Sequence, residues 1–144
     1  MHKIGIIGAG LISYIHANAI KEVDNAELIA VSEIVEPKAK KFVSEFGCDY
    51  YLDAEEMLKN ADIDMVIICL PTFLHEEYVA LAAEYKKNVL CEKPVEMTVA
   101  ATEKTLGTVK NTGIIFMVAQ VVRFWSGYTD IKEMYPARYR GELY

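Results

Sequence analysis

The sequence predicts an α/β fold, in which helices cover both faces of a doubly wound, mostly parallel sheet. Two observations carry this prediction. Apolar, strand-like runs alternate along the chain with helical patterns of roughly 10–15 residues, which is typical of right-handed βαβ units. The first run leads directly into a glycine-rich turn at Gly8–Ser13. At 144 residues the chain has room for one domain with a proper core.

The glycine-rich turn follows a short apolar strand expected at 3–7 and opens the first expected helix. In such a turn the first glycine permits a tight bend, and the second lets a phosphate approach because no Cβ is in the way. The third position must be small so that helix and strand pack closely, and here it is Ser13. The turn therefore indicates a pyrophosphate site at a helix N-terminus, a feature that several nucleotide-binding folds share.

The other elements follow in the order that this fold requires. Further strands are expected at 27–34, 64–70, 88–91 and 114–119, with a short one at 50–52. Helices are expected at 11–22, 37–46, 54–60, 73–85, 98–110 and 126–134.

Capping and patterning justify these bounds. Pro37 begins the second helix and Gly47 ends it, while Asp53 caps the third. From Met65 to residue 70 the sequence is an unbroken apolar run, which is typical of a strand covered on both faces. The first helix places four apolar residues on one face: Leu11, Ile12, Ile15 and Ala19.

Composition and charge exclude several classes of protein. Apolar residues make up 53% and charged residues 25%, as in a soluble globular protein, and the net charge of −6 argues against a nucleic-acid partner. We expect neither a membrane span, which needs roughly 18 apolar residues, nor a secretory signal. The three cysteines form no C-x-x-C pair. We interpret Cys69 and Cys91 as buried thiols, assign no metal site and expect a cytoplasmic protein.

Glu33 ends the second expected strand, twenty residues after Ser13. A dinucleotide-binding unit places at this point the acid that accepts hydrogen bonds from the adenosine ribose. The alternative interpretation is that Glu33 is a solvent-exposed acid at the end of a strand, without a ligand. Glu33 and Glu36 would repel a 2′-phosphate, which only Lys38 could offset, so NAD is favoured over NADP.

Pro71, Thr72 and His75 follow the apolar run at 64–70. They leave the carboxyl end of a central strand, which is the edge where open α/β sheets bind ligands. Pro71 fixes the turn, and Thr72 offers a hydroxyl and a helix cap. In the alternative interpretation, Thr72 only caps the helix and has no further function. His75 is then an exposed residue in the first turn of that helix.

Glu92, Lys93 and Pro94 leave the next strand at the same edge. A lysine held there can hydrogen-bond a substrate hydroxyl or polarise a carbonyl. A Glu-Lys pair at a strand end also fits a solvated turn.

Taken together, these residues resemble the amino-terminal NAD(P)-binding domain of the Gfo/Idh/MocA oxidoreductase family. The matching segments are 4–10, 15–17, 31–33, 64–66, 71–75, 91–94 and 120–124. They span nearly the whole chain, and Glu-Lys-Pro at its distance from the glycine turn is the most specific of them. The resemblance implies a Rossmann-like fold. It also implies an oxidoreductase that transfers a hydride between a nicotinamide cofactor and a sugar, cyclitol or related polyol.

The resemblance further implies roles for individual residues. Those that would bind the cofactor are Gly8, Gly10, Leu11, Ile12, Glu33, Leu70, Pro71, Thr72, His75, Glu92 and Gln120. The first four would hold the pyrophosphate, and Glu92 would lie near the nicotinamide ribose. Lys93 would contact the reacting hydroxyl and is the only catalytic candidate. Gln120 and Arg123 would lie where the chain leaves towards the substrate. Two departures, Ser13 for Gly or Ala and Glu33 for Asp, leave this assignment intact.

Family members also carry a second α+β domain, which would form the substrate wall and the oligomer interface. We therefore expect a dinucleotide-binding domain at 1–119, with 120–144 as a linker or the start of a second, absent domain. These 144 residues are then expected to form an incomplete enzyme. Whether residues 120–144 mediate self-association is left undecided by the sequence. The alternatives are a module that binds or senses NAD(H) without chemistry and, less compatible with Glu-Lys-Pro, a methyltransferase.

Overall fold

Six parallel strands form one sheet in the part of the chain that the computed structural model describes, residues 1–134. The strands are β1 (His2–Ile7), β2 (Ala26–Ser32), β3 (Asp49–Tyr51), β4 (Met65–Ile68), β5 (Asn88–Cys91) and β6 (Phe116–Val118). Their spatial order is β3-β2-β1-β4-β5-β6, so the direction of winding reverses between β1 and β4. Open parallel sheets bind ligands at such a reversal, beyond the carboxyl ends of the strands.

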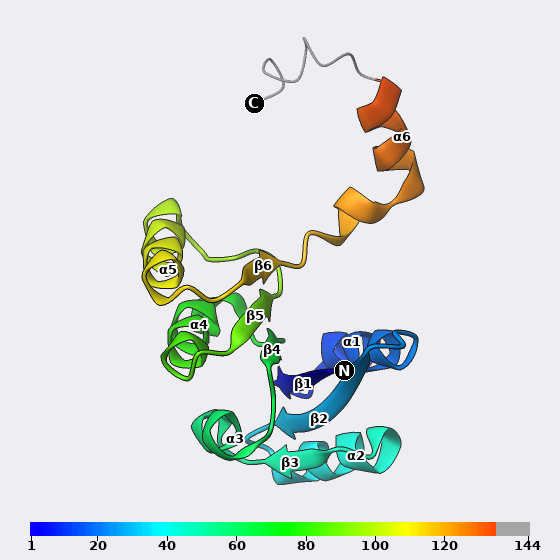
Figure 1. Ribbon diagram of the computed structural model, residues 1–144, viewed down its shortest axis with the longest axis vertical. Coiled ribbons are helices and arrows are strands. Elements are labelled where there is room, and N and C mark those ends of the chain that lie inside the picture. Colours follow the sequence, from blue (N-terminus) through cyan, green and yellow to red (C-terminus); the bar gives the residue numbers. More distant parts are fainter. Residues whose placement is uncertain (135–144) are drawn as a thin grey trace.

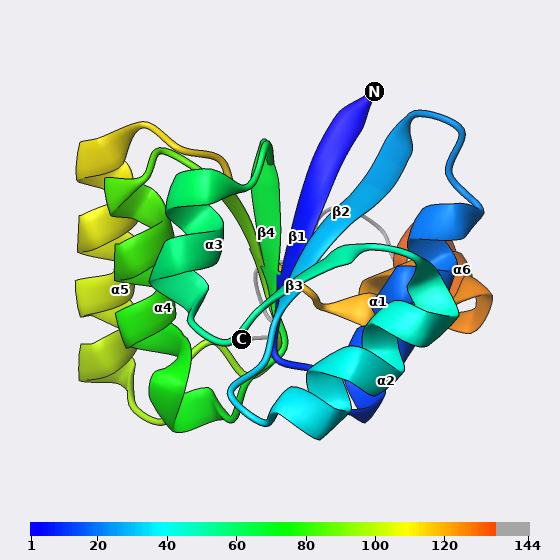
Figure 2. The same ribbon diagram turned by 90° about the horizontal axis from the view of Figure 1, so that it is seen from below.

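Within residues 1–134, helices cover both faces of this sheet (Figure 2). One face carries α1 (Leu11–Lys21) and α2 (Glu36–Phe46), and the other carries α3 (Ala54–Asn60), α4 (His75–Glu84) and α5 (Val99–Thr112). A 3₁₀ turn, η1 (Thr72–Leu74), precedes α4. After β6 the chain continues through a second 3₁₀ turn, η2 (Val121–Phe124), into α6 (Ser126–Met134), which projects beyond the sheet (Figure 1).

Two apolar cores, one on each face, follow from the alternation of side chains along the strands. In β1, Ile4 and Ile6 are buried in the core under α1 and α2, where Phe42 is their largest neighbour. Ile7 belongs to the core on the opposite face, together with Met57 of α3. Because β4 is covered on both faces, its sequence is a continuous apolar run.

The predicted fold class is confirmed, and so are most of the local signals. Asp53 caps α3 by accepting the Glu56 N–H at 2.9 Å. Gly47 ends α2 in the left-handed conformation, with φ of +71°. All three cysteines are buried and unbridged. No helix within residues 1–134 is long and apolar enough to cross a membrane.

The apolar face expected for α1 packs on the core only in part, through Ile12. Leu11 and Ile15 are 91% and 63% exposed, whereas Ser13 and Ala17 are fully buried. The helix starts directly at the glycine turn and lies close to the strands, so the fully buried positions of its first two turns carry small side chains.

The region after β4 also differs from the prediction. The strand ends at Ile68 rather than at residue 70. The expected helix at 73–85 is a 3₁₀ turn followed by α4, and Thr72 lies inside that turn without capping a helix. Leu70 thus lies outside the sheet, and its carbonyl oxygen is 2.9 Å from Nε2 of His75.

Candidate functional site

The glycine turn lies at the reversal point of the sheet, where β1 passes into α1. Gly8 has φ of +95°, a region that L side chains rarely adopt, and an added Cβ would lie 2.7 Å from the carbonyl oxygen of Cys69. Gly10 is the N-cap of α1, has no side chain to cap the first turn, and an added Cβ there would meet no atom within 4 Å. The turn thus leaves open space in front of uncapped backbone N–H groups, as an anion site requires.

Ser13 fits the third position of the turn and adds a bond of its own. Its side chain is fully buried, and its hydroxyl donates to the carbonyl oxygen of Gly8 at 2.6 Å. Since that carbonyl belongs to the residue with the constrained φ, the hydroxyl holds the turn in shape. Serine can therefore replace the usual glycine or alanine here, because its buried hydroxyl has a hydrogen-bond partner within the turn.

Glu33 reaches from the end of β2 to the same turn. Its Oε2 accepts the backbone N–H of Ala9 at 3.0 Å, and its Oε1 accepts the N–H of Val35 at 2.9 Å. Each carboxylate oxygen has a second lone pair, so a ribose hydroxyl can still donate to this group. The carboxylate is thereby fixed beside the turn rather than free in solvent.

A hollow of about 340 Å³ opens at this point between the glycine turn, the end of β2 and the segment after β4. Five of the predicted cofactor residues line it: Gly8, Gly10, Glu33, Leu70 and Pro71. Leu74 and Tyr78 also line it, although the sequence analysis did not single them out. Leu74 ends η1 and precedes α4, and Tyr78 follows four residues later on α4, so the two side chains share one face; this spacing was the available signal.

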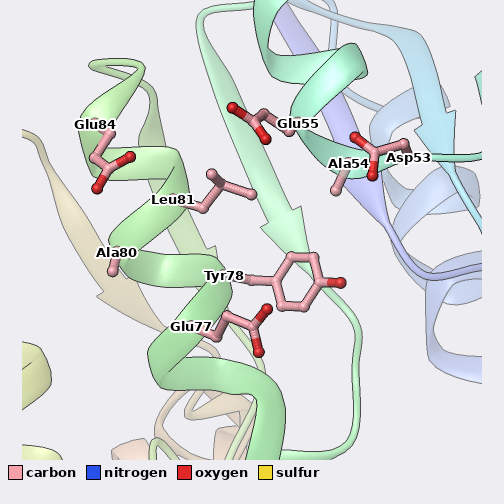
Figure 3. Close-up of a pocket in the computed structure, with 8 residues that line it drawn as sticks. All are labelled: Asp53, Ala54, Glu55, Glu77, Tyr78, Ala80, Leu81 and Glu84. Carbon is pink, nitrogen blue, oxygen red and sulfur yellow. The ribbon is translucent and has the colours of Figure 1, made fainter.

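A second hollow lies between α3 and α4 and is strongly acidic (Figure 3). Four carboxylates line it, those of Asp53, Glu55, Glu77 and Glu84, and the Tyr78 ring extends into it from α4. Burial and the neighbouring Glu77 raise the pKa of the Tyr78 hydroxyl. Such a surface repels an anionic dinucleotide, so the glycine-lined hollow is the candidate site.

Glu92 and Lys93 leave β5 at the same edge of the sheet. Glu92 is 9% exposed, and its Oε1 lies 2.8 Å from Nε2 of His16 on α1. Its Oε2 accepts the backbone N–H of Lys93 at 3.1 Å. The Lys93 side chain itself is exposed. The Glu-Lys pair is thus not simply a solvated turn, because Glu92 is buried and only the Lys93 side chain is exposed.

His75 lies behind the site rather than on its surface. It is 1% exposed and is not among the residues that line the glycine-turn hollow, so it is neither the exposed residue of the alternative interpretation nor part of the hollow's wall. Its Nδ1 lies 3.0 Å from the carbonyl oxygen of Pro94 and 3.1 Å from that of Val95. With Nε2 on Leu70, the ring joins the segment after β4 to the segment after Lys93.

The remaining predicted residues are not among those that line the hollow. Leu11 and Ile12 are on the first turn of α1, and Thr72 is in η1. Gln120 is exposed just after β6, and Arg123 is exposed in η2.

This strand order, the uncapped glycine turn and the carboxylate at the end of β2 define a dinucleotide-binding domain of the Rossmann type. The chain belongs to the Gfo/Idh/MocA oxidoreductase family, described as an oxidoreductase family with an NAD-binding Rossmann fold, whose model matches residues 2–120. The resemblance found in the sequence is thereby confirmed.

Several relatives are inositol dehydrogenases. Myo-inositol 2-dehydrogenase of Thermotoga maritima is 32% identical over 132 residues, which cover 91% of this chain and 40% of that protein. The scyllo-inositol 2-dehydrogenase (NAD(+)) of Bacillus subtilis is also 32% identical, over 90% of this chain and 39% of its own length. The crystal structure of scyllo-inositol dehydrogenase from Lactobacillus casei with bound cofactor NAD(H) and scyllo-inositol superposes with a TM-score of 0.88. The two sequences are 29% identical, and the superposition covers 93% of this chain and 40% of the Lactobacillus casei chain. The chain thus spans about two fifths of the length of these relatives.

Proposed function

We propose that this chain binds NAD(H) at the Gly8–Ser13 turn and forms the nucleotide-binding part of an oxidoreductase that acts on a sugar, cyclitol or related polyol. The observation that carries the proposal is the open, uncapped glycine turn with the Glu33 carboxylate fixed beside it. Family membership and the inositol dehydrogenases among the relatives support the cofactor class and the substrate class.

The residues present fit the adenosine and pyrophosphate half of the cofactor. The first-turn N–H groups of α1 have no capping side chain, and the space in front of Gly10 is open. Glu33 would accept the ribose hydroxyls through the lone pairs that Ala9 and Val35 leave free. Lys38 is the only basic residue among those that line the hollow, so a 2′-phosphate would face the Glu33 carboxylate with little compensation. We therefore propose NAD rather than NADP.

Lys93 is the residue that we assign to the reacting oxygen. When bound, the nicotinamide ring accepts or returns the hydride. The Lys93 ammonium group would donate a hydrogen bond to the substrate hydroxyl, or to the carbonyl oxygen in the reverse direction, and so stabilise the developing charge. Its exposure and its position at the carboxyl edge of the sheet suit this role, because the substrate must reach it from solvent.

Titration with NADH and NADPH, followed by absorbance at 340 nm with inositols, ketoses and other polyols, tests this function. We expect NADH to bind more tightly than NADPH. A Lys93→Ala variant should keep NADH affinity and lose any turnover, while Lys110→Ala, an exposed lysine near the end of α5, changes neither. Nucleotide binding without absorbance change for any substrate would favour a non-catalytic binding module. Absence of NADH binding would overturn the proposal.

A further inference from the structure

His16 and Glu92 form a mostly buried pair at the edge of the candidate site. Their side chains are 17% and 11% exposed, and Nε2 of His16 lies 2.8 Å from Oε1 of Glu92. A carboxylate oxygen only accepts hydrogen bonds, so Nε2 carries the hydrogen and donates it. The two residues are 76 positions apart in the sequence. The contact therefore ties α1, which begins at the glycine turn, to the end of β5.

The carboxylate of Glu92 is shared between His16 and the lysine that follows it. One oxygen faces His16, and the other accepts the backbone N–H of Lys93 at 3.1 Å. The orientation of the carboxylate thus determines whether the Lys93 backbone has a partner. On the far side of the same turn, the carbonyl oxygens of Pro94 and Val95 lie within hydrogen-bonding distance of His75 Nδ1.

Stability alone does not account for such a pair. Removing a carboxylate and an imidazole from water carries a desolvation cost, and well-packed apolar side chains of similar volume are often as stable or more so. Here the polar pair lies directly beside the residue assigned to the reaction. A role in holding that residue in place explains why this position is polar.

We propose that His16 is a positioning residue, which holds Glu92 and, through Glu92, the Lys93 turn at the nicotinamide end of the site. This inference rests on the proposed function, since it takes NAD(H) as the ligand and Lys93 as the residue to be positioned. It adds that His16 acts on the nicotinamide half of the cofactor alone. The adenosine and pyrophosphate half would be held by Glu33 and the glycine turn, and within residues 1–134 the side-chain hydrogen bonds of Glu33 and Ser13 do not involve the His16 side chain.

Comparison of NADH with ADP separates these two halves, because ADP carries the adenosine and the pyrophosphate but no nicotinamide riboside. In the full chain we expect His16→Ala to weaken NADH binding by about tenfold, because Glu92 loses the donor that orients it at the nicotinamide end of the site, and to leave ADP affinity within about twofold. His16→Gln should retain most of the NADH affinity, because its amide nitrogen can donate to Glu92. His2→Ala, at an exposed histidine, is the matched control and should change neither constant.

Hydrogen exchange at the Lys93 amide supplies a readout that needs no ligand. In His16→Ala we expect this amide to exchange faster while the β4 core amides keep their wild-type protection, and in His16→Gln we expect it to stay slow. If the alanine variant does not fold, His16→Met fills a similar volume without a donor and takes its place.

Equal weakening of NADH and ADP, or unchanged NADH affinity with unchanged exchange at Lys93, would overturn the role of His16. Wild-type chain that binds neither nucleotide would instead refute the proposed function. The exchange measurement would then still show whether His16 holds the Lys93 turn.

Discussion

Alanine at Gly8 should reduce mainly the stability of the chain, whereas alanine at Gly10 should reduce mainly its affinity for the nucleotide. Gly8→Ala places a Cβ at φ of +95° and 2.7 Å from the backbone oxygen of Cys69, which cannot swing away as a flexible side chain could. Gly10→Ala places its Cβ in open space at φ of −83°, a conformation that alanine adopts readily. Gly8 is therefore required by the fold, whereas Gly10 is required by the ligand.

The magnitudes follow from these two geometries. For Gly8→Ala the backbone conformation costs about 1–3 kcal/mol and the close approach to Cys69 adds about 1–3 kcal/mol, so we expect a loss of about 4 kcal/mol. In a domain of this size that lowers the midpoint of thermal unfolding by roughly 10 °C. For Gly10→Ala the weaker helix cap and the less flexible unfolded chain nearly offset each other, and stability should stay within about 1 kcal/mol. The added methyl group occupies the phosphate approach, so NADH affinity should fall at least about tenfold, or about 1.4 kcal/mol.

Urea unfolding measures the first quantity and NADH titration the second, both on the same three proteins. Gly10→Ala with wild-type affinity would refute the placement of the phosphates. Gly8→Ala with wild-type stability would refute the packing of the turn against the segment after β4.

Three further predictions concern Ser13, Glu33 and the three buried cysteines. Ser13→Ala leaves the buried Gly8 carbonyl without its hydroxyl partner and should cost about 1–3 kcal/mol in urea unfolding; an unchanged midpoint would mean that the bond is not made. Glu33→Ala should weaken NADH binding about tenfold and reduce the preference over NADPH, and a retained preference in parallel titrations would remove Glu33 from cofactor selection. Burial raises the pKa of the Cys69 and Cys91 thiols to about 12 and that of Cys48 to about 11. The folded chain should therefore resist thiol reagents at pH 8 and react fully in urea. Since the folded state retains protons that the unfolded thiols release above their ordinary pKa of 9.0, stability should fall as pH rises from 9 towards 12, with no fall from these groups below 9.

Local chemistry made much of this site predictable. A glycine turn after an apolar strand, an acid at the end of the next strand and Glu-Lys-Pro at the end of a third all depend on short segments. The parallel sheet then brings the carboxyl ends of those strands to one edge. Gly8, Gly10 and Glu33 accordingly lie in one hollow.

Other features depend on contacts that no short segment contains. The hydrophobic pattern of α1 points to Leu11 and Ile15, but the residues that the helix buries against the sheet are Ser13, Ala17 and Ile20. The pairing of His16 with Glu92 depends on the position of β5 two places from β1, which is a property of strand order rather than of spacing.

The assignment of the glycine turn as the nucleotide site can be tested residue by residue. We propose a titration of the ¹⁵N-labelled chain with NADH, followed in amide ¹H–¹⁵N spectra. The account predicts that the largest shifts occur at the amides of Ala9–Ser13 and at Glu33, next to the open space of the turn. Shifts confined to the acidic hollow between α3 and α4, or no shifts at the turn at saturating NADH, would contradict it.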